Sequence, residues 1–431
     1  MKTVIMAGGK GTRISSLFSD IPKPMIRIDG VPVLEREIEC LVSQGFDDII
    51  ITVGHLGKVI MDYFGDGSGV SPMTGKPFRA HISYYFEKTP LGNGGALFKI
   101  RDQLTDDFLL LNADAVFDVN FKRFVEAHHT MGGLVTLFVH ANSHPYDSGL
   151  LITDKNGAVI QWLAKEDKRP QWYFNIVNAG LHVMNKKVLE HPVDTAKVDL
   201  DRQILKPLAG TGEMFVYNSP EYVEDMGTPE RYDKVQRSFM SGMIHARNLA
   251  NRQKAVFLDR DGTMNRYVGY LTKPEDFELL PGVAEAIRKI NLSGYLAIVV
   301  TNQPSIARGE LTYDGLDEIH RKMETLLGQK GAYVDHIYFC PHHPDKGFPG
   351  EVPSLKIDCG CRKPKPGMLL QAGEDFNIDL SSSWMIGDDE RDVGAGKNAG
   401  CHTALIGHQD FGQDKTVQSL LQFVDETLPE A

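Results

Sequence analysis

A pair of acids at the end of an apolar run could do phosphate chemistry. Asp259 and Asp261 follow the run 255–258 and are followed in turn by Gly262 and Thr263. At the carboxyl end of a parallel strand, where such folds bind ligands, two acids at this spacing can share one site. One carboxylate could attack a phosphoryl group while the other protonates the leaving oxygen. A solvated acidic turn is the alternative reading of this pair alone.

Three later stretches of the same half offer supporting groups. Thr301 ends another apolar run and can donate its hydroxyl to a phosphoryl oxygen, and Lys363 can offset developing charge. Asp388 and Asp389 end a third run. Carboxylates from separate strand ends can hold Mg²⁺, which takes hard oxygen ligands, and the ion would let an anionic Asp259 approach an anionic phosphate.

Three of the five cysteines gather within residues 340–361 of the chain. Together with one histidine they match the ligand set of a structural zinc site: Cys340, His342, Cys359 and Cys361. His343 is an alternative imidazole, and buried cysteines at a strand end are the non-metal alternative. The intervening segment is rich in Pro, Gly and charge, so it cannot form a core of its own. We therefore predict that Zn²⁺ staples this loop and presents Arg362 and Lys363 to the phosphate.

The N-terminal half begins with a glycine-rich turn directly after the apolar run 3–7. Its glycines would let backbone amides approach a phosphate chain, and nearby cations would add donors: Gly8, Gly9, Gly11, Arg13 and Lys23. The turn matches neither the dinucleotide fingerprint nor the P-loop. A second glycine-rich turn, 91–98, is suited to lying against a flat base.

Two acids in this half stand at distant strand ends. Asp114 ends the run 108–114, and Asp225 lies more than a hundred residues later. If both converged on one metal ion, they would help to neutralise a triphosphate during attack. Taken singly, Asp225 could cap a helix near Thr228, and Asn178 could be a turn residue.

The elements that must position these groups alternate along the chain. Short apolar runs and amphipathic stretches follow one another to about residue 237 and again from residue 254, which predicts two doubly wound α/β domains in tandem, 1–237 and 254–431. Residues 238–253 carry little strand signal and are predicted to be a linker. A chain of 431 residues suits two domains.

Composition narrows the class further. The 42% apolar and 24% charged residues describe soluble globular material, and a formal charge of -11 argues against nucleic-acid partners. No apolar run is long enough for a membrane span or a signal peptide. We expect a cytoplasmic protein with small-molecule substrates and no membrane partner, in which homo-oligomers are possible.

The order of motifs over residues 254–408 resembles the haloacid dehalogenase (HAD) superfamily of aspartate-nucleophile phosphatases. The resemblance implies Asp259 as nucleophile and Asp261 as general acid and then base. It also implies Mg²⁺ held by Asp259, the Asp261 carbonyl and Asp388, with phosphate contacts from Thr301 and Lys363.

The zinc loop is similar to those of two groups within this superfamily, the heptose bisphosphate and the histidinol phosphatases. The stretches TNQPSIARGELT and CRKPKPGM are closer to the heptose group. That likeness implies substrate contacts from Asn302, Arg308 and Arg362. Pro304 and Ser305 depart from the group's usual TNQSGIARG, and Asp389 stands where Lys is common.

Residues 1–237 resemble the sugar-1-phosphate nucleotidyltransferases, which use a Rossmann-like fold. The implied reaction is in-line attack of a sugar 1-phosphate on the α-phosphate of a nucleoside triphosphate, with release of pyrophosphate. Positioning and charge stabilisation would carry its rate. The implied residues are Asp114 and Asp225 for Mg²⁺, Arg13 and Lys23 for phosphates, Gly8, Gly9, Gly11, Thr12 and Gly92 for the nucleotide, and Glu166 and Asn178 for the sugar. Ser16 and Ala113 depart from the common Pro and Gly.

The two resemblances fit together on one sugar. A 7-phosphatase acting on heptose 1,7-bisphosphate would yield heptose 1-phosphate, the acceptor that the first half needs. The pairing implies a bifunctional enzyme of GDP-D-glycero-α-D-manno-heptose synthesis that uses GTP. Three alternatives stay open: another sugar or base, an N-terminal half that senses sugar nucleotides without catalysis, and a nucleic-acid-binding zinc module.

Overall fold

The computed structural model describes residues 1–9, 18, 21–190 and 197–429 and divides into two compact units. Unit 1 comprises Met1–His140, Gly149–Leu163 and Asn178–Asn248. Unit 2 comprises Ala141–Ser148, Ala164–Val177 and Leu249–Ala431. The predicted boundary around 238–253 stays a prediction. Among the described residues, no helix combines the length and the apolar character of a membrane span.

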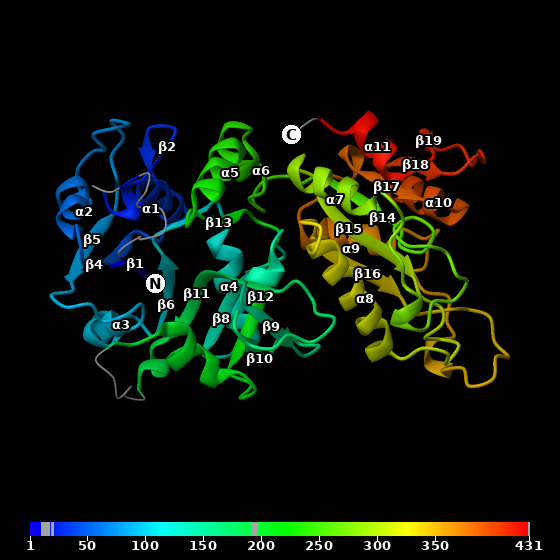
Figure 1. The fold of residues 1–431 in the computed structure, drawn as a ribbon, viewed down its shortest axis with the longest axis horizontal. Coiled ribbons are helices and arrows are strands. Elements are labelled where there is room, and N and C mark those ends of the chain that lie inside the picture. Colours follow the sequence, from blue (N-terminus) through cyan, green and yellow to red (C-terminus); the bar gives the residue numbers. More distant parts are fainter. Residues whose placement is uncertain (10–17, 19–20, 191–196, 430–431) are drawn as a thin grey trace. The chain divides into compact units, whose positions relative to one another are not determined.

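Unit 1 is built on a mixed sheet of nine strands, visible in blue to green in Figure 1. Its main path runs in the order β10-β9-β11-β6-β1-β4-β5, and β8 continues from β11 to β12. The strands are β1 (Lys2–Ala7), β4 (Asp48–Val53), β5 (His81–Phe86), β6 (Asp107–Asn112), β8 (Val135–His140), β9 (Leu150–Thr153), β10 (Val159–Leu163), β11 (Val177–Asn185) and β12 (Met214–Asn218). Pairing is parallel from β6 through β1 and β4 to β5, whereas β11 runs antiparallel to β6.

Two short strand pairs and the helices complete unit 1. The pairs are β2 (Arg27–Ile28) with β3 (Val31–Pro32) and β7 (Ala115–Phe117) with β13 (Val223–Asp225). The helices are α1 (Val33–Ser43), α2 (Gly57–Phe64), α3 (Gly95–Ile100), α4 (Phe121–Met131), α5 (Pro229–Met240) and α6 (Met243–Ala246). Helices α1, α2 and α4 bury apolar side chains in one core with β1, β4 and β6. Residues 238–253, which were predicted to be a linker, contain the end of α5 and all of α6.

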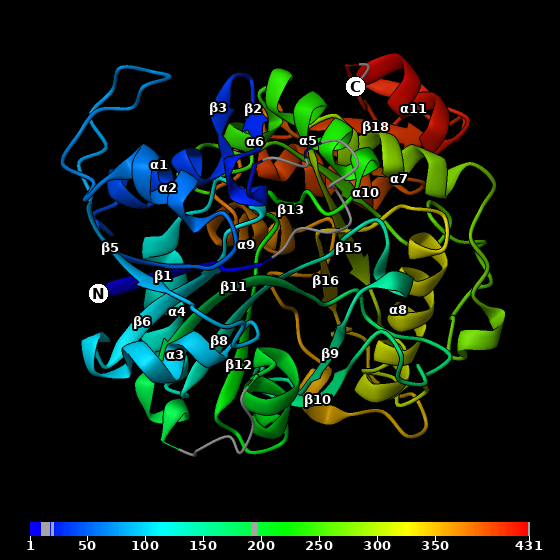
Figure 2. The same ribbon diagram turned by 60° about the vertical axis from the view of Figure 1, so that its left-hand side comes forward.

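Unit 2 has a six-stranded, wholly parallel sheet in the order β16-β15-β14-β17-β18-β19. Its strands are β14 (Ala255–Leu258), β15 (Leu296–Asn302), β16 (His336–Cys340), β17 (Trp384–Gly387), β18 (His402–Ile406) and β19 (Lys415–Val417). Its helices are α7 (Val283–Leu292), α8 (Tyr313–Gly328), α9 (Gly367–Asp375), α10 (Glu390–Ala399) and α11 (Leu420–Thr427). Figure 2 gives a second view of these elements.

The strands of unit 2 are buried on both faces, which explains their continuous apolar runs. Alternate residues of β14 enter different cores: Val256 and Leu258 pack with α7, α8 and α11, whereas Ala255 and Phe257 pack with α9 and α10. The order of strands reverses at β14, because β15 lies on one side and β17 on the other. Ligands of open α/β sheets bind at the carboxyl ends of the strands at such a reversal. The predicted α/β class of both halves is confirmed.

Candidate functional site

In unit 2, the carboxyl ends of β14, β15 and β17 surround a cavity of about 490 Å³. Most of the predicted phosphatase residues line it: Asp259, Asp261, Thr301, Asn302, Arg362, Lys363, Asp388 and Asp389. Gly262 lets the acids approach one another, because its φ is +94° and an added Cβ would lie 2.0 Å from a carboxylate oxygen of Asp388. Sequence order scatters these residues over 130 positions, and the parallel sheet brings them together.

Lys363 lies at the centre of the acids. Its Nζ is 2.6 Å from Oδ1 of Asp259 and 2.6 Å from Oδ1 of Asp392, and it donates to the Val300 carbonyl at 2.8 Å. Burial raises the pKa of Asp259 to about 7, and repulsion by Asp392 acts in the same direction while Lys363 opposes it. Burial and the charge of Asp392 also raise the pKa of Asp388, to about 6. Three acids crowded at one spot are a reason to expect a cation between them.

Asp259, Asp388 and Asp392 form a group that could hold a metal ion, because one oxygen of each lies within 4.8 Å of the others. Asp392 was not among the predicted residues. It is the third residue of α10, in the first turn, and its carboxylate accepts from the backbone N–H of Asp389 at 3.2 Å in a capping box. The signal was present in GDDERD, because an acid four residues after Asp388 returns to the same face at a helix start.

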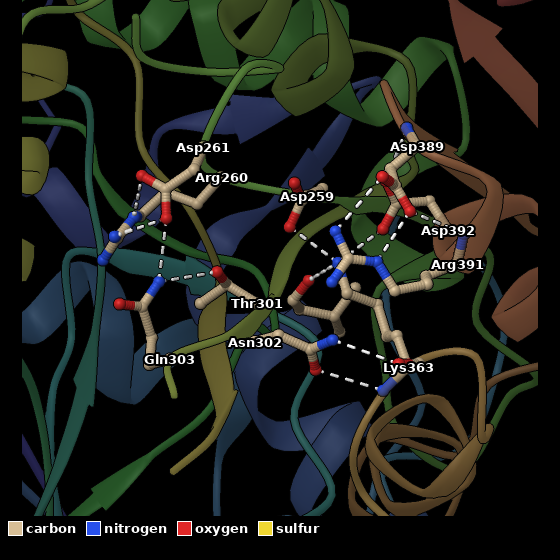
Figure 3. Close-up of polar contacts among 11 residues, drawn as sticks. Asp259, Arg260, Asp261, Thr301, Asn302, Gln303, Lys363, Asp389, Arg391 and Asp392 are labelled. Atoms are coloured by element: carbon tan, nitrogen blue, oxygen red, sulfur yellow. Dashed lines mark hydrogen bonds and ion pairs between the residues drawn. The ribbon is translucent and has the colours of Figure 1, made fainter. Parts of the chain in front are cut away.

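The side chain of Asp261 turns away from this group, as Figure 3 shows. It accepts from Arg260 at 2.7 and 3.2 Å, from Asn265 at 3.0 Å and from Gln303 at 2.9 Å. Burial would raise the pKa of Asp261, but the charge and hydrogen bonds of Arg260 outweigh it, so the pKa lies below its usual value. The predicted metal contact through the carbonyl of Asp261 stays a prediction.

Asn302 and Arg308 occupy supporting positions in the structure. The amide of Asn302 holds the backbone of Lys363 from both sides, accepting from its N–H and donating to its carbonyl, each at 3.1 Å. The guanidinium of Arg308 lies between two rings, 4.3 Å from the centre of Tyr270 and 4.2 Å from that of Phe348. Tyr270 lines the cavity and Phe348 belongs to the cysteine-containing loop. Arg308 is thereby held beside the cavity by that loop.

Asp389, the departure noted in the sequence, is paired with a cation in the wall of the same cavity. Arg391 donates to Asp389 at 2.7 and 3.1 Å, and both residues line the cavity. These hydrogen bonds lower the pKa of Asp389 and raise that of Arg391. The guanidinium therefore supplies positive charge close to the position where the resembled family commonly has Lys.

The four predicted zinc ligands converge on one point. The Sγ atom of Cys361 is 3.2 Å from Cys340 Sγ, 3.3 Å from Cys359 Sγ and 3.4 Å from His342 Nδ1. No cysteine in the described chain forms a disulfide, and the four donor atoms lie within 4.8 Å of one another. Three thiols and one imidazole at these separations fit a tetrahedral ion. His343, the alternative, instead accepts from the Asp345 N–H at 3.2 Å and lines the cavity.

The loop that carries this Cys/His cluster is fastened to the phosphate cavity. Arg362 donates to the His342 carbonyl at 3.3 Å, and the Val352 N–H donates to the Ala307 carbonyl at 3.0 Å. The thiols also act on one another, because hydrogen bonding with Cys340 and Cys359 lowers the pKa of Cys361 to about 5. A thiolate is the form that binds metal. The geometry agrees with a loop that positions Arg362 and Lys363.

Unit 1 has its own cavity, of about 530 Å³, at the carboxyl ends of β1 and β6. Five predicted residues line it: Gly8, Gly9, Lys23, Gly92 and Asp114. Lys23 Nζ lies 2.5 Å from Asp114 Oδ2. Gly92 has φ +82°, and an added Cβ would lie 2.2 Å from the Val198 carbonyl oxygen, so only glycine fits there. The remaining loop predictions, Gly11, Thr12 and Arg13, and the departure Ser16 lie outside the described residues.

The two predicted metal acids of unit 1 have neighbouring backbones: Asp114 lies in the turn just before β7, and Asp225 ends β13. Asp225 in β13 pairs with Ala115, the residue after Asp114, and the Met226 N–H donates to the Asp114 carbonyl at 3.2 Å. The carboxylate of Asp225 accepts from the Gly227 N–H at 2.7 Å and pairs with Arg231 at 2.5 Å. Their side chains thus start from adjacent backbone, although only Asp114 lines the cavity.

The two residues predicted to contact the sugar, Asn178 and Glu166, belong to different units. Asn178 is in β11, and its side chain accepts from the Gly180 N–H at 3.1 Å. Glu166 lies in the segment Ala164–Val177, which belongs to unit 2. Glu87, which the sequence reasoning missed, lines the unit 1 cavity and accepts from the Leu91 N–H at 3.0 Å. Its position directly after the strand β5 was the available signal.

Fold and sites together define two catalytic classes in one chain, a nucleotidyltransferase and a phosphatase. The Nucleotidyl transferase family model matches residues 2–241, and a HAD-hydrolase-like model matches residues 360–424. The D-glycero-beta-D-manno-heptose-1,7-bisphosphate 7-phosphatase of Pasteurella multocida is 45% identical over 148 residues, which are 34% of this chain and 77% of that protein. The chain therefore belongs to the nucleotidyl transferase family in its first half and to the family of these HAD phosphatases in its second, and it is a bifunctional enzyme.

Two further proteins are similar to parts of this chain. The D-glycero-alpha-D-manno-heptose-1,7-bisphosphate 7-phosphatase of Burkholderia mallei is 41% identical over 155 residues, or 36% of this chain and 80% of that protein. The crystal structure of HddC from Yersinia pseudotuberculosis is similar to 55% of this chain and 99% of its own, with 27% identity and a TM-score of 0.47.

Proposed function

We propose that the enzyme makes GDP-D-glycero-α-D-manno-heptose in two consecutive steps. Unit 2 removes the 7-phosphate of heptose 1,7-bisphosphate, and unit 1 transfers a guanylyl group from GTP to the resulting heptose 1-phosphate with release of pyrophosphate. One observation carries the proposal: a single chain joins a nucleotidyl transferase family match over residues 2–241 to a region 45% identical to a heptose bisphosphate 7-phosphatase. The product of the phosphatase in unit 2, heptose 1-phosphate, is the acceptor that the transferase in unit 1 requires.

The phosphatase step is assigned to the cavity of unit 2. Asp259 attacks the phosphoryl group, and Asp261 protonates the leaving sugar oxygen and then activates water. Thr301 and Lys363 bind phosphoryl oxygens, while Asn302, Arg308 and Arg362 hold and frame the substrate. Asp259, Asp388 and Asp392 would hold Mg²⁺, which would supply charge neutralisation at the phosphate.

The guanylyl transfer is assigned to the cavity of unit 1. Gly8, Gly9 and Gly92 line it with little side-chain bulk, and Lys23 brings a cation to the same wall. Asp114 and Asp225 are the proposed Mg²⁺ ligands, with Arg13, Gly11 and Thr12 on the phosphates and Glu166 and Asn178 on the sugar. An in-line attack needs no covalent enzyme intermediate, so orientation and charge stabilisation carry the rate.

The function is tested by mass spectrometry of reaction products. Wild-type protein is incubated with Mg²⁺, an equal mixture of GTP, ATP, CTP and UTP, and either the α or the β anomer of heptose 1,7-bisphosphate. We expect a GDP-heptose peak from the α anomer. Heptose 1-phosphate without any sugar nucleotide would favour a sensor role for unit 1, another nucleotide would correct the base, and untouched bisphosphate would contradict the heptose assignment.

We further propose that the Cys/His cluster holds Zn²⁺ as a structural ion. Replacement of Cys359 by Ser is expected to release the ion and to lower phosphatase kcat/KM about 100-fold, because misplaced Arg308, Arg362 and Lys363 no longer meet the substrate. Zinc content per chain and phosphate release are measured together. Cys401→Ser is the matched control, since Cys401 is a buried free thiol outside the cluster. Full phosphatase activity in zinc-free protein would refute the role of the ion.

A further inference from the structure

Gln303 joins the two sides of the phosphatase site. It follows β15, and its side chain is buried, with 3% of the residue exposed. Its Nε2 donates to Oδ2 of Asp261 at 2.9 Å and to Oγ1 of Thr301 at 3.0 Å. Figure 3 shows the amide reaching between the two residues, with dashed lines to both. One NH₂ group therefore uses both of its hydrogens inside the site.

The orientation of this amide follows from chemistry. The oxygens of Asp261 already accept from Arg260 and Asn265, so they act as acceptors here, and the nitrogen of Gln303 faces them. The same nitrogen then faces Thr301 and can only donate, so the Thr301 oxygen must accept. The hydroxyl hydrogen of Thr301 is therefore not used in this contact. In the part of the chain that the structure describes, this hydroxyl takes part in no other hydrogen bond. Thr301 lines the cavity, so that hydrogen is available to a phosphoryl oxygen.

Asp261 is also fixed by a second buried contact. Arg260 has no exposed surface and donates to Asp261 at 2.7 Å, and its other terminal nitrogen is 3.2 Å from Nε2 of His320 in α8. Burial and the adjacent guanidinium hold the pKa of His320 well below its usual value, so the ring is neutral and can accept. Arg260 thus anchors Asp261, and Gln303 is the donor that connects this anchored acid to Thr301.

We propose that Gln303 is a positioning residue that fixes the direction of hydrogen bonding in the phosphatase site. It keeps Thr301 as a donor toward the phosphoryl oxygen and holds Asp261 on the side of the leaving group. The neighbouring Asn302 has a different task, because its amide holds the backbone of Lys363. The inference rests on the proposed roles of Thr301 and Asp261, but it does not depend on which sugar is bound.

The test reverses the hydrogen bond between Gln303 and Thr301 by replacing the NH₂ group of Gln303 with an oxygen. Gln303→Glu keeps the size of the side chain but replaces the donor by an oxygen, which accepts the Thr301 hydrogen and repels Asp261. We expect kcat for hydrolysis of p-nitrophenyl phosphate to fall on the order of 100-fold, the usual effect of losing one donor to the reacting group. Gln371→Glu is the matched control, since Gln371 donates to Asp375 at 2.9 Å on the exposed surface of α9. The control is expected to keep wild-type activity.

A double-mutant cycle separates this role from a general loss of structure. In a Thr301→Val background there is no hydroxyl to redirect, so adding Gln303→Glu is expected to cost clearly less than it does in the wild type. Gln303→Leu, which adds no charge, is measured in the same cycle, and thermal unfolding verifies that each variant is folded. Additive effects for both Gln303 variants would overturn the inference. Full activity of Thr301→Val would contradict the proposed role of Thr301, and the inference would fall with it.

Discussion

Replacing Asp259 by Asn is expected to abolish phosphate release while leaving nucleotidyl transfer intact. The amide has nearly the shape of the carboxylate but is not a nucleophile, so the covalent step cannot start. We expect phosphatase kcat to fall by at least about 10⁴-fold, as when other enzymes lose their nucleophile. The fold should survive, because Lys363 keeps its contacts with Asp392 at 2.6 Å and with the Val300 carbonyl at 2.8 Å. Phosphate release is measured with heptose bisphosphate and with p-nitrophenyl phosphate.

The matched control is Asp425→Asn. Asp425 pairs with Lys289 at 2.5 Å on an exposed surface of unit 2, and neither residue lines the cavity, so this variant removes an aspartate–lysine ion pair outside the site. Surface pairs of this kind contribute little to stability, and activity should be unchanged. In parallel, GDP-heptose formation is assayed from added heptose 1-phosphate. If Asp259→Asn lost that second activity as well, the assignment of independent sites would be wrong.

Local spacing explains why most of the phosphatase site could be predicted from the sequence. Asp259 and Asp261 stand two residues apart at a strand end, and Cys359 and Cys361 are equally close. Such short-range patterns limit geometry strongly, because a strand end or a tight loop leaves few directions for the side chains. The Cys/His cluster accordingly forms with His342, which the alternating spacing favoured over His343.

The contacts that orient these groups could not be predicted in the same way. His320 reaches Arg260 only because α8 packs on one face of the sheet, and Gln303 reaches Asp261 across 42 positions of sequence. These pairings depend on how side chains of different elements pack together. Sequence periodicity predicts which face of an element is buried, but it does not predict which residue of another element that face contacts. In unit 1, the position of Glu87 directly after β5 was the available signal, but it does not reveal that this strand end lines the cavity.

The segment containing Glu166 illustrates another limit. Glu166 lies between β10 and β11 in sequence and was predicted to contact the sugar of the first half, yet its segment, Ala164–Val177, groups with unit 2. Within unit 2, the Tyr173 N–H donates to Thr325 Oγ1 at 2.9 Å, and the Asn175 N–H donates to Glu324 at 2.6 Å. Burial raises the pKa of Glu324 to about 7. Long-range contacts of this kind leave no local pattern, so the role of Glu166 stays a proposal.

Replacing Asp114 by Asn is expected to have the opposite effect to Asp259→Asn. Asp114 is the carboxylate in the wall of the unit 1 cavity that pairs with Lys23 at 2.5 Å. Its loss removes a proposed Mg²⁺ ligand and leaves Lys23 without its partner, so charge on the triphosphate is less well compensated during attack. We expect kcat for GDP-heptose formation to fall about 10²- to 10³-fold, in line with the loss of one preorganised electrostatic group.

The measurement is pyrophosphate release from GTP and heptose 1-phosphate, with phosphate release from heptose bisphosphate assayed in the same samples. Asp62→Asn is the matched control, because Asp62 pairs with Lys58 at 2.7 Å on the exposed surface of α2 and should leave both activities unchanged. Raising the Mg²⁺ concentration should partly restore activity in Asp114→Asn if the lost group is a metal ligand, since weaker binding is then overcome by mass action. Unchanged guanylyl transfer in Asp114→Asn would show that the cavity of unit 1 is not the transfer site. A loss of transfer activity that no Mg²⁺ concentration relieves would show that Asp114 holds Lys23 in place and does not bind the metal.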